Sequence, residues 1–246
     1  MIKVKPLGVN GAFTKYYHNN YIFELGNRKL LVDAGTTLRS SLIESLYQES
    51  DITDIVITHL HSDHVGGLEE FAQRCKWVHN HKPTLWIRTE LAGGLLQIIS
   101  SGLCTDGLKL SDYFNLEFID DGFIIDAYEV ELIYTDNLHA GNMLSMGLKI
   151  NDIQGYKNII FTSDIAKHKE AQFDGYIDQL TVALFHDVSV VPNAVHSFLH
   201  DVIDYYKGKI ELNKIYGMHY QDDIDIKTLN KETGINFVTR NTTYEF

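Results

Sequence analysis

The chain has 246 residues, of which 44% are apolar and 22% are charged, as is ordinary for a soluble globular protein. Its net charge of −12 disfavours a long DNA or RNA ligand, because such polyanions repel an acidic chain. Its two cysteines, Cys75 and Cys104, are too few for a disulfide framework and indicate free thiols in a reducing compartment.

The first half of the chain is predicted to mix strands with helices. Apolar alternation and β-branched residues indicate strands at 2–9, 21–25 and 29–35, and the last two form a hairpin around residues 26–28. A helix is expected at 40–49, a buried strand at 54–59, a helix at 68–74 and a strand at 83–87. An apolar stretch follows at 90–100.

The second half repeats this mixture. Strands are predicted at 115–120, 128–135, 144–150, 157–164, 181–185 and 214–220, with a helix at 193–206 and a short final α/β segment. Two β-rich halves that each close with helices predict an α/β sandwich of two sheets with helices on both outer faces. No linker, repeat or composition shift divides the chain, so we expect a single domain, residues 1–246.

No segment is predicted to reach or cross a membrane. The first residues are basic, but no apolar stretch follows them, and none elsewhere approaches the roughly 18 apolar residues of a membrane span. We therefore expect a cytoplasmic protein without a membrane partner.

A cluster of metal-ligand side chains follows the strand predicted at 54–59. The segment THLHSDHVGG, residues 58–67, contains His59, His61, Asp63 and His64. In an extended chain the first three would share one side, and His64 would point elsewhere unless the chain turns at the following glycines. Ligands that face two ways predict two metal ions, zinc first, with manganese or iron less favoured.

Further candidate ligands lie at the ends of other predicted strands. His139 lies between two strands, Asp164 follows the apolar segment NIIFTS, and His219 follows KIYGM. Such strand ends lead into loops, which commonly carry functional side chains. Each residue alone is typical of an ordinary turn, but together with the cluster at 59–64 they indicate a site for two metals.

These segments resemble those of the metallo-β-lactamase superfamily. THLHSDH matches its H-x-H-x-D-H signature, and LLVDAG, FTSD and GMH stand in the order of its other characteristic segments over almost the whole chain. The resemblance implies an αβ/βα four-layer sandwich with the site at the sheet edges. The superfamily includes lactamases, lactonases, thioester hydrolases, dioxygenases and nucleases, so the fold alone does not identify the substrate.

The resemblance also implies a role for each ligand. Asp164 would bridge two zinc ions, with manganese as the alternative, and Asp33 would orient ligands through hydrogen bonds. The first ion would be held by His59, His61 and His139, and the second by Asp63, His64 and His219.

Finer segments resemble ribonuclease Z-like phosphodiesterases. LFHDVS and AVHSF are similar to the paired HEAT and HST segments of those enzymes. This places His186 and Asp187 near the site and His196 at the phosphate-contacting position, with Asp187 holding its imidazole. The catalytic residues implied are Asp63, Asp187 and His196. The alternative for His196 is a position at the N-terminus of a helix, without a catalytic role.

The chain lacks the Gly/Pro-rich arm with which ribonuclease Z grips transfer RNA, and its acidic charge also disfavours that ligand. It more closely resembles the phage-type anti-Pycsar cyclic-nucleotide phosphodiesterases. That resemblance implies hydrolysis of 3′,5′-cyclic mononucleotides, such as cCMP and cUMP, to 5′ monophosphates in order to evade cyclic-nucleotide immune signalling, in the host cytosol if the chain is phage-encoded. The alternatives are an RNA-processing endonuclease, a lactone or thioester hydrolase, or a protein that sequesters a nucleotide without turnover.

The stretch from about residue 89 to residue 114 is apolar, contains glycine and is long for a connection. It is a lid, part of the core or a dimer surface. We expect a homodimer in which one chain helps to close the pocket of its partner, as the phage-type resemblance also implies.

Other histidines carry no functional prediction. His79 and His81 form a second H-x-H pair, but no third ligand accompanies them, so we expect a surface strand end. His18, His168 and His200 have no companions that would indicate a site.

Overall fold

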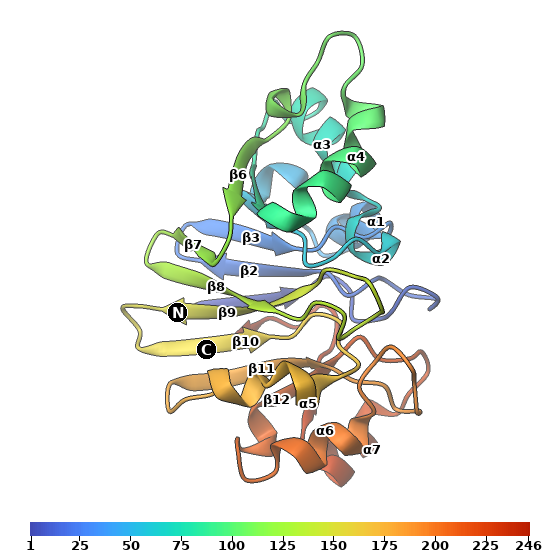
Figure 1. The fold of residues 1–246 in the computed structure, drawn as a ribbon, viewed down its shortest axis with the longest axis vertical. Helices are drawn as coiled ribbons and strands as arrows, with labels where there is room; N and C mark the ends of the chain where they lie inside the picture. Colours follow the sequence, from blue (N-terminus) through green and yellow to red (C-terminus); the bar gives the residue numbers. More distant parts are fainter.

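Two seven-stranded sheets pack face to face in the middle of the molecule (Figure 1). The computed structural model describes residues 1–246. The first sheet has the strand order β14–β1–β2–β3–β4–β5–β6. Its strands are β1 (Ile2–Pro6), β2 (Tyr21–Leu25), β3 (Arg28–Val32), β4 (Asp54–Val56), β5 (Thr84–Arg88), β6 (Asn115–Ile119) and β14 (Tyr244–Glu245).

The second sheet has the strand order β13–β12–β11–β10–β9–β8–β7. Its strands are β7 (Gly122–Ile125), β8 (Tyr128–Tyr134), β9 (Met146–Asp152), β10 (Lys157–Phe161), β11 (Thr181–Asp187), β12 (Ile215–Met218) and β13 (Asn236–Phe237). The strand β7 was not among the predicted elements, and it pairs with β8 as the antiparallel edge of this sheet.

Helices cover the outer face of each sheet, which gives the molecule four layers (Figure 1). This arrangement confirms the predicted αβ/βα sandwich. The helices α1 (Leu38–Glu44), α2 (Ser62–Val65), α3 (Leu68–Trp77) and α4 (Ala92–Leu103) lie on the side of the first sheet. The helices α5 (His168–Ala171), α6 (Leu199–Tyr206) and α7 (Ile226–Thr233) lie on the side of the second.

The sheets are joined by a core of buried aromatic side chains. The ring of Tyr21 on β2 lies 5.2 Å from that of Phe161 on β10, and Phe23 lies 5.9 Å from the same ring, both edge to face. Such pairs add to the free energy gained from burying apolar area. This core fixes the two sheets against each other, and therefore fixes the loops at their edges.

The parallel parts of the two sheets determine where the site forms. Strands β3 to β6 run parallel in the first sheet, as do β10 to β13 in the second. Parallel strands end at the same edge of a sheet, and ligand sites of α/β sheets lie outside those carboxyl ends. The predicted ligands His59, Asp164 and His219 follow β4, β10 and β12 at that edge.

The helix predicted at 193–206 is shorter than expected, because only Leu199–Tyr206 is helical. The N–H of Ser189 donates to the carbonyl of Ser197 at 2.7 Å, and the N–H of Leu199 donates to the carbonyl of Ser189 at 2.9 Å. Backbone groups before α6 therefore pair with the chain that follows β11 instead of forming a helical turn. As a result, His196 lies in a loop and not at a helix N-terminus.

The apolar segment at 90–100 contributes mainly to the core. It forms α4, whose Leu95, Ile99 and Leu103 are buried in the cluster between the first sheet and its helices. Its other face is partly exposed, with 42% of Ile98 accessible to solvent. A Cβ at Gly94 would lie 2.6 Å from Cδ1 of Leu60, so α4 packs directly against the loop that carries the histidine motif.

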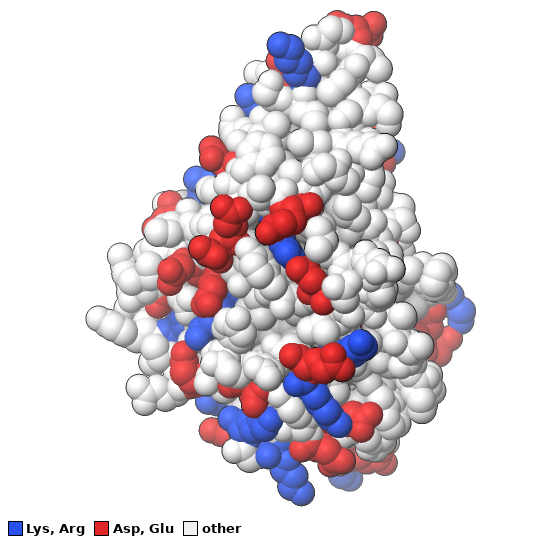
Figure 2. Space-filling model, in the orientation of Figure 1, with Lys and Arg blue, Asp and Glu red and all other residues white.

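Charged side chains are mixed on the face shown in Figure 2, where Lys and Arg alternate with Asp and Glu and form no continuous basic track. None of the helices has the length and apolar character required to cross a membrane.

Candidate metal centre

The histidine motif leaves β4 in an extended conformation and then enters the short helix α2. His61 is the residue directly before α2, and Asp63 and His64 lie within it. The prediction that Asp63 shares one side of an extended chain with His59 and His61 is therefore wrong. A helical turn at 62–65 rotates its carboxylate away from these two residues and toward His64.

The first group of potential ligands consists of three imidazoles, those of His59, His61 and His139. The Nδ1 atom of His61 lies 3.2 Å from Nε2 of His59 and 3.1 Å from Nε2 of His139. Two nitrogens bound to one tetrahedral zinc at about 2.0–2.1 Å would lie about 3.3 Å apart. The spacing of this group therefore fits a single zinc-sized cation.

The second group combines two carboxylates with two imidazoles, from Asp63, His64, Asp164 and His219. The Oδ2 atom of Asp63 lies 3.4 Å from Nε2 of His64 and 3.5 Å from Nε2 of His219. All four residues are buried, between 0% and 4% exposed. Buried groups of this kind are stable when they bind one another or a cation.

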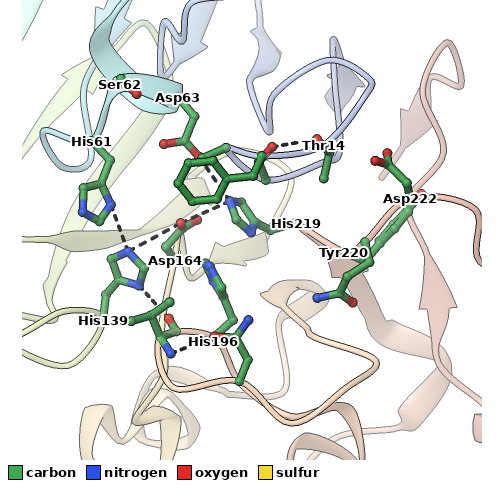
Figure 3. Close-up of a pocket in the computed structure, with 16 residues that line it drawn as sticks. Thr14, His61, Ser62, Asp63, His139, Asp164, His196, His219, Tyr220 and Asp222 are labelled. Atoms are coloured by element: carbon green, nitrogen blue, oxygen red, sulfur yellow. Dashed lines mark hydrogen bonds and ion pairs between the residues drawn. The ribbon is translucent and has the colours of Figure 1, made fainter.

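Asp164 lies between the two groups (Figure 3). Its Oδ2 atom is 3.3 Å from Nε2 of His64 and 3.2 Å from Nε2 of His219. The same oxygen is 3.9 Å from Nε2 of His59 and 3.7 Å from Nε2 of His139. One carboxylate therefore faces both sets of nitrogens, which is the position that a bridging ligand requires.

Hydrogen bonds on the far side of the rings fix which nitrogen faces the centre. Nδ1 of His139 lies 2.7 Å from the carbonyl oxygen of Val195, and Nδ1 of His64 lies 2.7 Å from Oδ2 of Asp33. Because the carbonyl and the carboxylate accept hydrogen bonds, each Nδ1 carries a proton, and Nε2 is the nitrogen directed inward. Histidines that bind metals are commonly oriented in this way.

Asp33 is held in turn by the loop after β4. Its carboxylate accepts hydrogen bonds from the backbone N–H of Thr58 at 2.8 Å and from the Thr58 hydroxyl. The hydroxyl of Ser163 donates to that of Thr58 at 2.7 Å. Asp33 thus takes the orienting position implied by the resemblance. The roles of Thr58 and Ser163 were not predicted, although Thr58 directly precedes His59 in the sequence and Ser163 directly precedes Asp164.

The electrostatics of the centre favour a cation. Burial lowers the pKa of His59 well below its ordinary value, which keeps its imidazole in the neutral form that binds metal. Burial also opposes a charge on His64, but the carboxylates of Asp164 and Asp33 outweigh it and raise the pKa of His64 well above its ordinary value. An environment that stabilises a buried imidazolium also suits a divalent ion.

The unpaired atoms of the centre give an independent test of this fit. Nε2 of His64, Nε2 of His219 and Oδ1 of Asp164 are buried and have no hydrogen-bond partner. Leaving such atoms unpaired is costly, on the order of 1–3 kcal/mol each. All three are donor atoms of the types that zinc binds. The residues present therefore fit a metal centre.

The backbone is strained at several positions of the centre. Asp33, Ser163 and His219 have positive φ angles of 67°, 55° and 60°. Residues other than glycine adopt this region at an energetic cost, and they do so most often at functional sites. Each of the three residues lies just after a strand, where the chain must turn sharply to point a side chain across the sheet edge.

His196 adjoins the centre without belonging to either group of ligands. Its Nδ1 atom lies 2.9 Å from Oδ2 of Asp187, and its ring stacks on that of His219 with the ring centres 4.4 Å apart. Burial opposes the charged imidazolium, but the carboxylate of Asp187 outweighs it and raises the pKa of His196 to about 9. The ring therefore lies beside the candidate metal ligands, where Asp187 favours its protonated form (Figure 3).

His186 lies behind the centre rather than in it. Its Nδ1–H donates to the backbone carbonyl of Asp187, and its ring packs against those of His168 and Tyr206. Alternate residues of β11 face opposite sides, so Asp187 faces the site and His186 faces α6. Of the two residues expected near the site, only Asp187 directs its side chain toward it.

His168, for which no function was predicted, connects two loops of the centre through hydrogen bonds. Its Nδ1 atom lies 2.9 Å from the hydroxyl of Ser197, which donates to the carbonyl of Ile165 at 2.7 Å. These two hydrogen bonds therefore join the loop after β10 to the loop that carries His196. No local sequence signal reveals this contact, because the residues are about 30 positions apart.

The candidate metal centre forms the floor of a pocket of about 580 Å³. The loop after β1, the loop after β11 and the loop after β12 form its walls. Its lining outside the ligand groups comprises Gly11, Ala12, Phe13, Thr14, Ser62, Asn193, Val195, His196, Tyr220, Gln221 and Asp222. A volume of this size accommodates a small-molecule ligand.

The second H-x-H pair is not part of a metal site. His79 bonds to the carboxylate of Glu49, and His81 bonds to the carbonyl of Ile52, both at the end of the first sheet. His79 and His81 follow α3, in a turn rather than at the end of a strand as predicted. Their role is to join that turn to the segment before β4.

Comparison with known proteins identifies the family. The family model described as anti-Pycsar protein Apyc1 matches residues 2–244. The chain belongs to the anti-Pycsar Apyc1 family. An anti-Pycsar protein Apyc1 from Paenibacillus sp. (strain J14) is 31% identical over 232 residues, covering 91% of each chain. Another from Bacillus phage vB_BveM-Goe7 is 29% identical over 241 residues, covering 91% of this chain and 90% of the phage protein.

Solved structures share the fold of this Apyc1 family member. The metallo-β-lactamase fold protein YhfI from Bacillus subtilis has a TM-score of 0.79 at 17% identity, covering 100% of this chain and 99% of YhfI. The short form of human tRNase Z has a TM-score of 0.71 at 14% identity, covering 99% and 98%. Yeast PDE1 has a TM-score of 0.70 at 13% identity, covering 98% of both chains.

Proposed function

We propose that this protein is a metal-dependent phosphodiesterase that hydrolyses 3′,5′-cyclic mononucleotides, such as cCMP and cUMP, to 5′ monophosphates. Such an activity would remove the cyclic-nucleotide signal of an antiviral response, in keeping with the anti-Pycsar name of the family. The observation that carries the proposal is the position of His196, a donor held by Asp187 beside two groups of metal ligands at the floor of a pocket.

The centre would hold two zinc ions, with manganese as the alternative. His59, His61 and His139 would bind the first ion. Asp63, His64 and His219 would bind the second, and Asp164 would bridge them. Two such ions lower the pKa of a water molecule between them and draw negative charge from the phosphate oxygens.

The side chains around the ions would position the substrate and the attacking water. The buried carboxylates of Asp63 and Asp164 would orient that water toward phosphorus, since the Oδ2 atom of each faces the imidazole nitrogens of His64 and His219. Thr58 and Asp33 would keep the His64 imidazole fixed while charge moves in the centre. Residues held by their neighbours in this way do not reorganise during the reaction, which lowers its barrier.

His196 would act on the phosphate and on the departing oxygen. Its Nδ1–H is bonded to Asp187, so the Nε2–H of the imidazolium is free to donate. In the ground state this N–H would bind a phosphate oxygen, and during cleavage it would give its proton to the ribose 3′ oxygen. Breaking the bond to that oxygen leaves the phosphate on the 5′ carbon.

A turnover panel tests the proposal. Protein loaded with zinc or with manganese would be incubated with cyclic mononucleotides, cyclic dinucleotides, precursor transfer RNA, a lactone and bis-p-nitrophenyl phosphate. We expect turnover of cyclic mononucleotides to 5′ monophosphates and little cleavage of precursor transfer RNA. A 3′ monophosphate product, turnover confined to the lactone, or a nucleotide bound unchanged over hours would contradict the proposal.

The active form would be a homodimer, in which the partially exposed face of α4 contacts the partner subunit. Ile98 on that face is 42% exposed, and its helix packs against the loop of the histidine motif through Leu60. A partner seated there would contact the helix that packs on Leu60, the residue between the candidate ligands His59 and His61.

A further inference from the structure

Phe13 is an unusual residue of the pocket, because its side chain is fully exposed, with a relative accessibility of 104%. Single exposed apolar side chains are common on protein surfaces. This ring, however, lines the same pocket as the candidate metal ligands and His196. No residue of the chain packs against it, although aromatic rings gain much of their stabilisation from such packing.

The loop that carries Phe13 is fixed at both sides of the ring. Thr14 donates its hydroxyl hydrogen to the carbonyl of Gly11 at 2.7 Å, which closes a tight turn under Phe13. The N–H of Lys15 donates to the carboxylate of Asp222 at 2.8 Å, and its ammonium pairs with Asp223 at 2.6 Å. The loop is therefore tied to the opposite end of the chain while the phenyl ring stays free.

The loop also lies directly on the metal centre. A Cβ at Gly11 would lie only 2.7 Å from Cε1 of His219, so only glycine allows the backbone to approach this ligand so closely. Phe13 follows two residues later. The ring and the candidate ligands line one pocket, so a small molecule that binds at the centre with its phosphate can contact the ring with its other end.

We infer that Phe13 is the platform on which the nucleobase of the substrate stacks. This inference rests on the proposed phosphodiesterase function. With the cyclic phosphate at the metals, the base of a mononucleotide is the part that extends toward the pocket rim. A flat, exposed phenyl ring is the chemical group suited to the face of a base.

Two polar side chains of the pocket are already hydrogen-bonded within the protein, which favours stacking on the face of a base over hydrogen bonds to its edge. Gln221 accepts a hydrogen bond from the N–H of Val190 and donates one to the hydroxyl of Ser189, so both ends of its amide are used within the protein. The amide oxygen of Asn193 accepts from the N–H of Val195. Stacking is available to every base, and we therefore expect purine and pyrimidine cyclic mononucleotides to bind with similar affinity.

The test compares a substrate that has a base with one that lacks it. Steady-state turnover of cCMP, cUMP and cAMP would be measured beside that of a methyl riboside 3′,5′-cyclic phosphate, which keeps the ribose and the cyclic phosphate. We expect Phe13→Ala to raise KM for the nucleotides roughly 5- to 150-fold, the range for loss of one base-stacking contact. The kcat/KM for the methyl riboside should not change, and Phe13→Trp should restore the nucleotide KM.

Tyr16→Ala provides the matched control, because Tyr16 is an aromatic residue of the same loop, 55% exposed, that does not line this pocket. It should leave all four substrates unaffected. The inference that Phe13 stacks on the base would be overturned if Phe13→Ala lowered kcat/KM equally for the nucleotides and the methyl riboside. It would also be overturned if the substitution changed turnover of no substrate. A parent protein that turns over no cyclic mononucleotide would instead overturn the proposed function and, with it, the platform.

Discussion

The carboxylate of Asp187 lies 2.9 Å from Nδ1 of His196 and is itself buried, with its second hydrogen bond coming from the backbone N–H of Ile165. A buried, ionised carboxylate beside an imidazole stabilises the charged form of that imidazole. The pair therefore favours a positive charge on His196, next to the predicted metal ligands.

This pair predicts a change in the pH dependence of turnover. The pKa of His196 is raised to about 9 by Asp187, so the imidazolium is the main form at neutral pH and is lost as the pH rises through the pKa. Bound divalent ions will lower that value somewhat, because they repel the imidazolium. In Asp187→Asn the alkaline limb of the kcat profile should shift to lower pH, as measured by initial rates between pH 6 and pH 10. An unchanged limb would show that another group titrates there.

The substitution His196→Ala should separate metal binding from catalysis. Because His196 acts on phosphate charge and proton transfer, its loss should lower kcat by about 10²–10⁴-fold. The metal content should stay at the value of the parent protein, as measured by elemental analysis. His200→Ala is the matched control, since His200 is exposed and lies four residues further along. Loss of metal from His196→Ala would place this residue among the ligands.

Asp164→Ala should remove the bridge between the two groups of ligands. The parent protein is expected to contain close to two zinc equivalents, and the variant should lose metal and activity together. Elemental analysis after gel filtration measures the first, and cyclic-nucleotide turnover measures the second. Asp201→Ala, a change of the same kind on the exposed surface of α6, should affect neither. Full activity in Asp164→Ala would refute the assignment.

Asp33→Asn tests the orientation of the His64 imidazole. Asparagine tolerates the positive φ of 67° at this position, so the backbone should not change. The amide cannot accept from His64 and Thr58 as strongly as the carboxylate does, and metal affinity should fall about 10–100-fold. Competition with a chromogenic chelator measures the dissociation constants. Affinity equal to that of the parent protein would show that Asp33 stabilises the fold only.

The oligomeric state tests the role of α4. Ile98→Glu places a charge on the partly exposed face of this helix and should weaken the proposed homodimer. Sedimentation velocity at several protein concentrations measures the change. Ile43→Glu, at a position that is 58% exposed on α1, is the matched control and should leave the dimer intact. A strictly monomeric parent protein with full activity would contradict the proposal.

The sequence alone determined the fold class and the types of residue in the candidate centre. The candidate ligands can be recognised within short stretches of the sequence. The residues from His59 to His64 lie in one segment, and His139, Asp164 and His219 each follow an apolar strand. Strands end at sheet edges, so a strand-end position already predicts proximity to a site. The strand-like runs at 21–25 and 29–35, joined by residues 26–28, likewise predicted the hairpin of β2 and β3, because such signals are local.

Only the tertiary structure decided which way Asp63 faces, a point that the spacing of the motif alone misjudged, and what surrounds the ligands. The turn of α2 places Asp63 in the group of His64, as the family resemblance implied, whereas a period-2 reading of the motif placed it with His59 and His61. The loop conformation at His196 was also missed, because the backbone before α6 pairs with Ser189, which no local propensity reveals. The contact of Gly11 with His219, and with it the placement of Phe13 over the centre, joins residues about 200 positions apart. The packing of the two sheets brings such residues together. Sequence patterns depend on residues that are close along the chain, so they cannot predict these contacts.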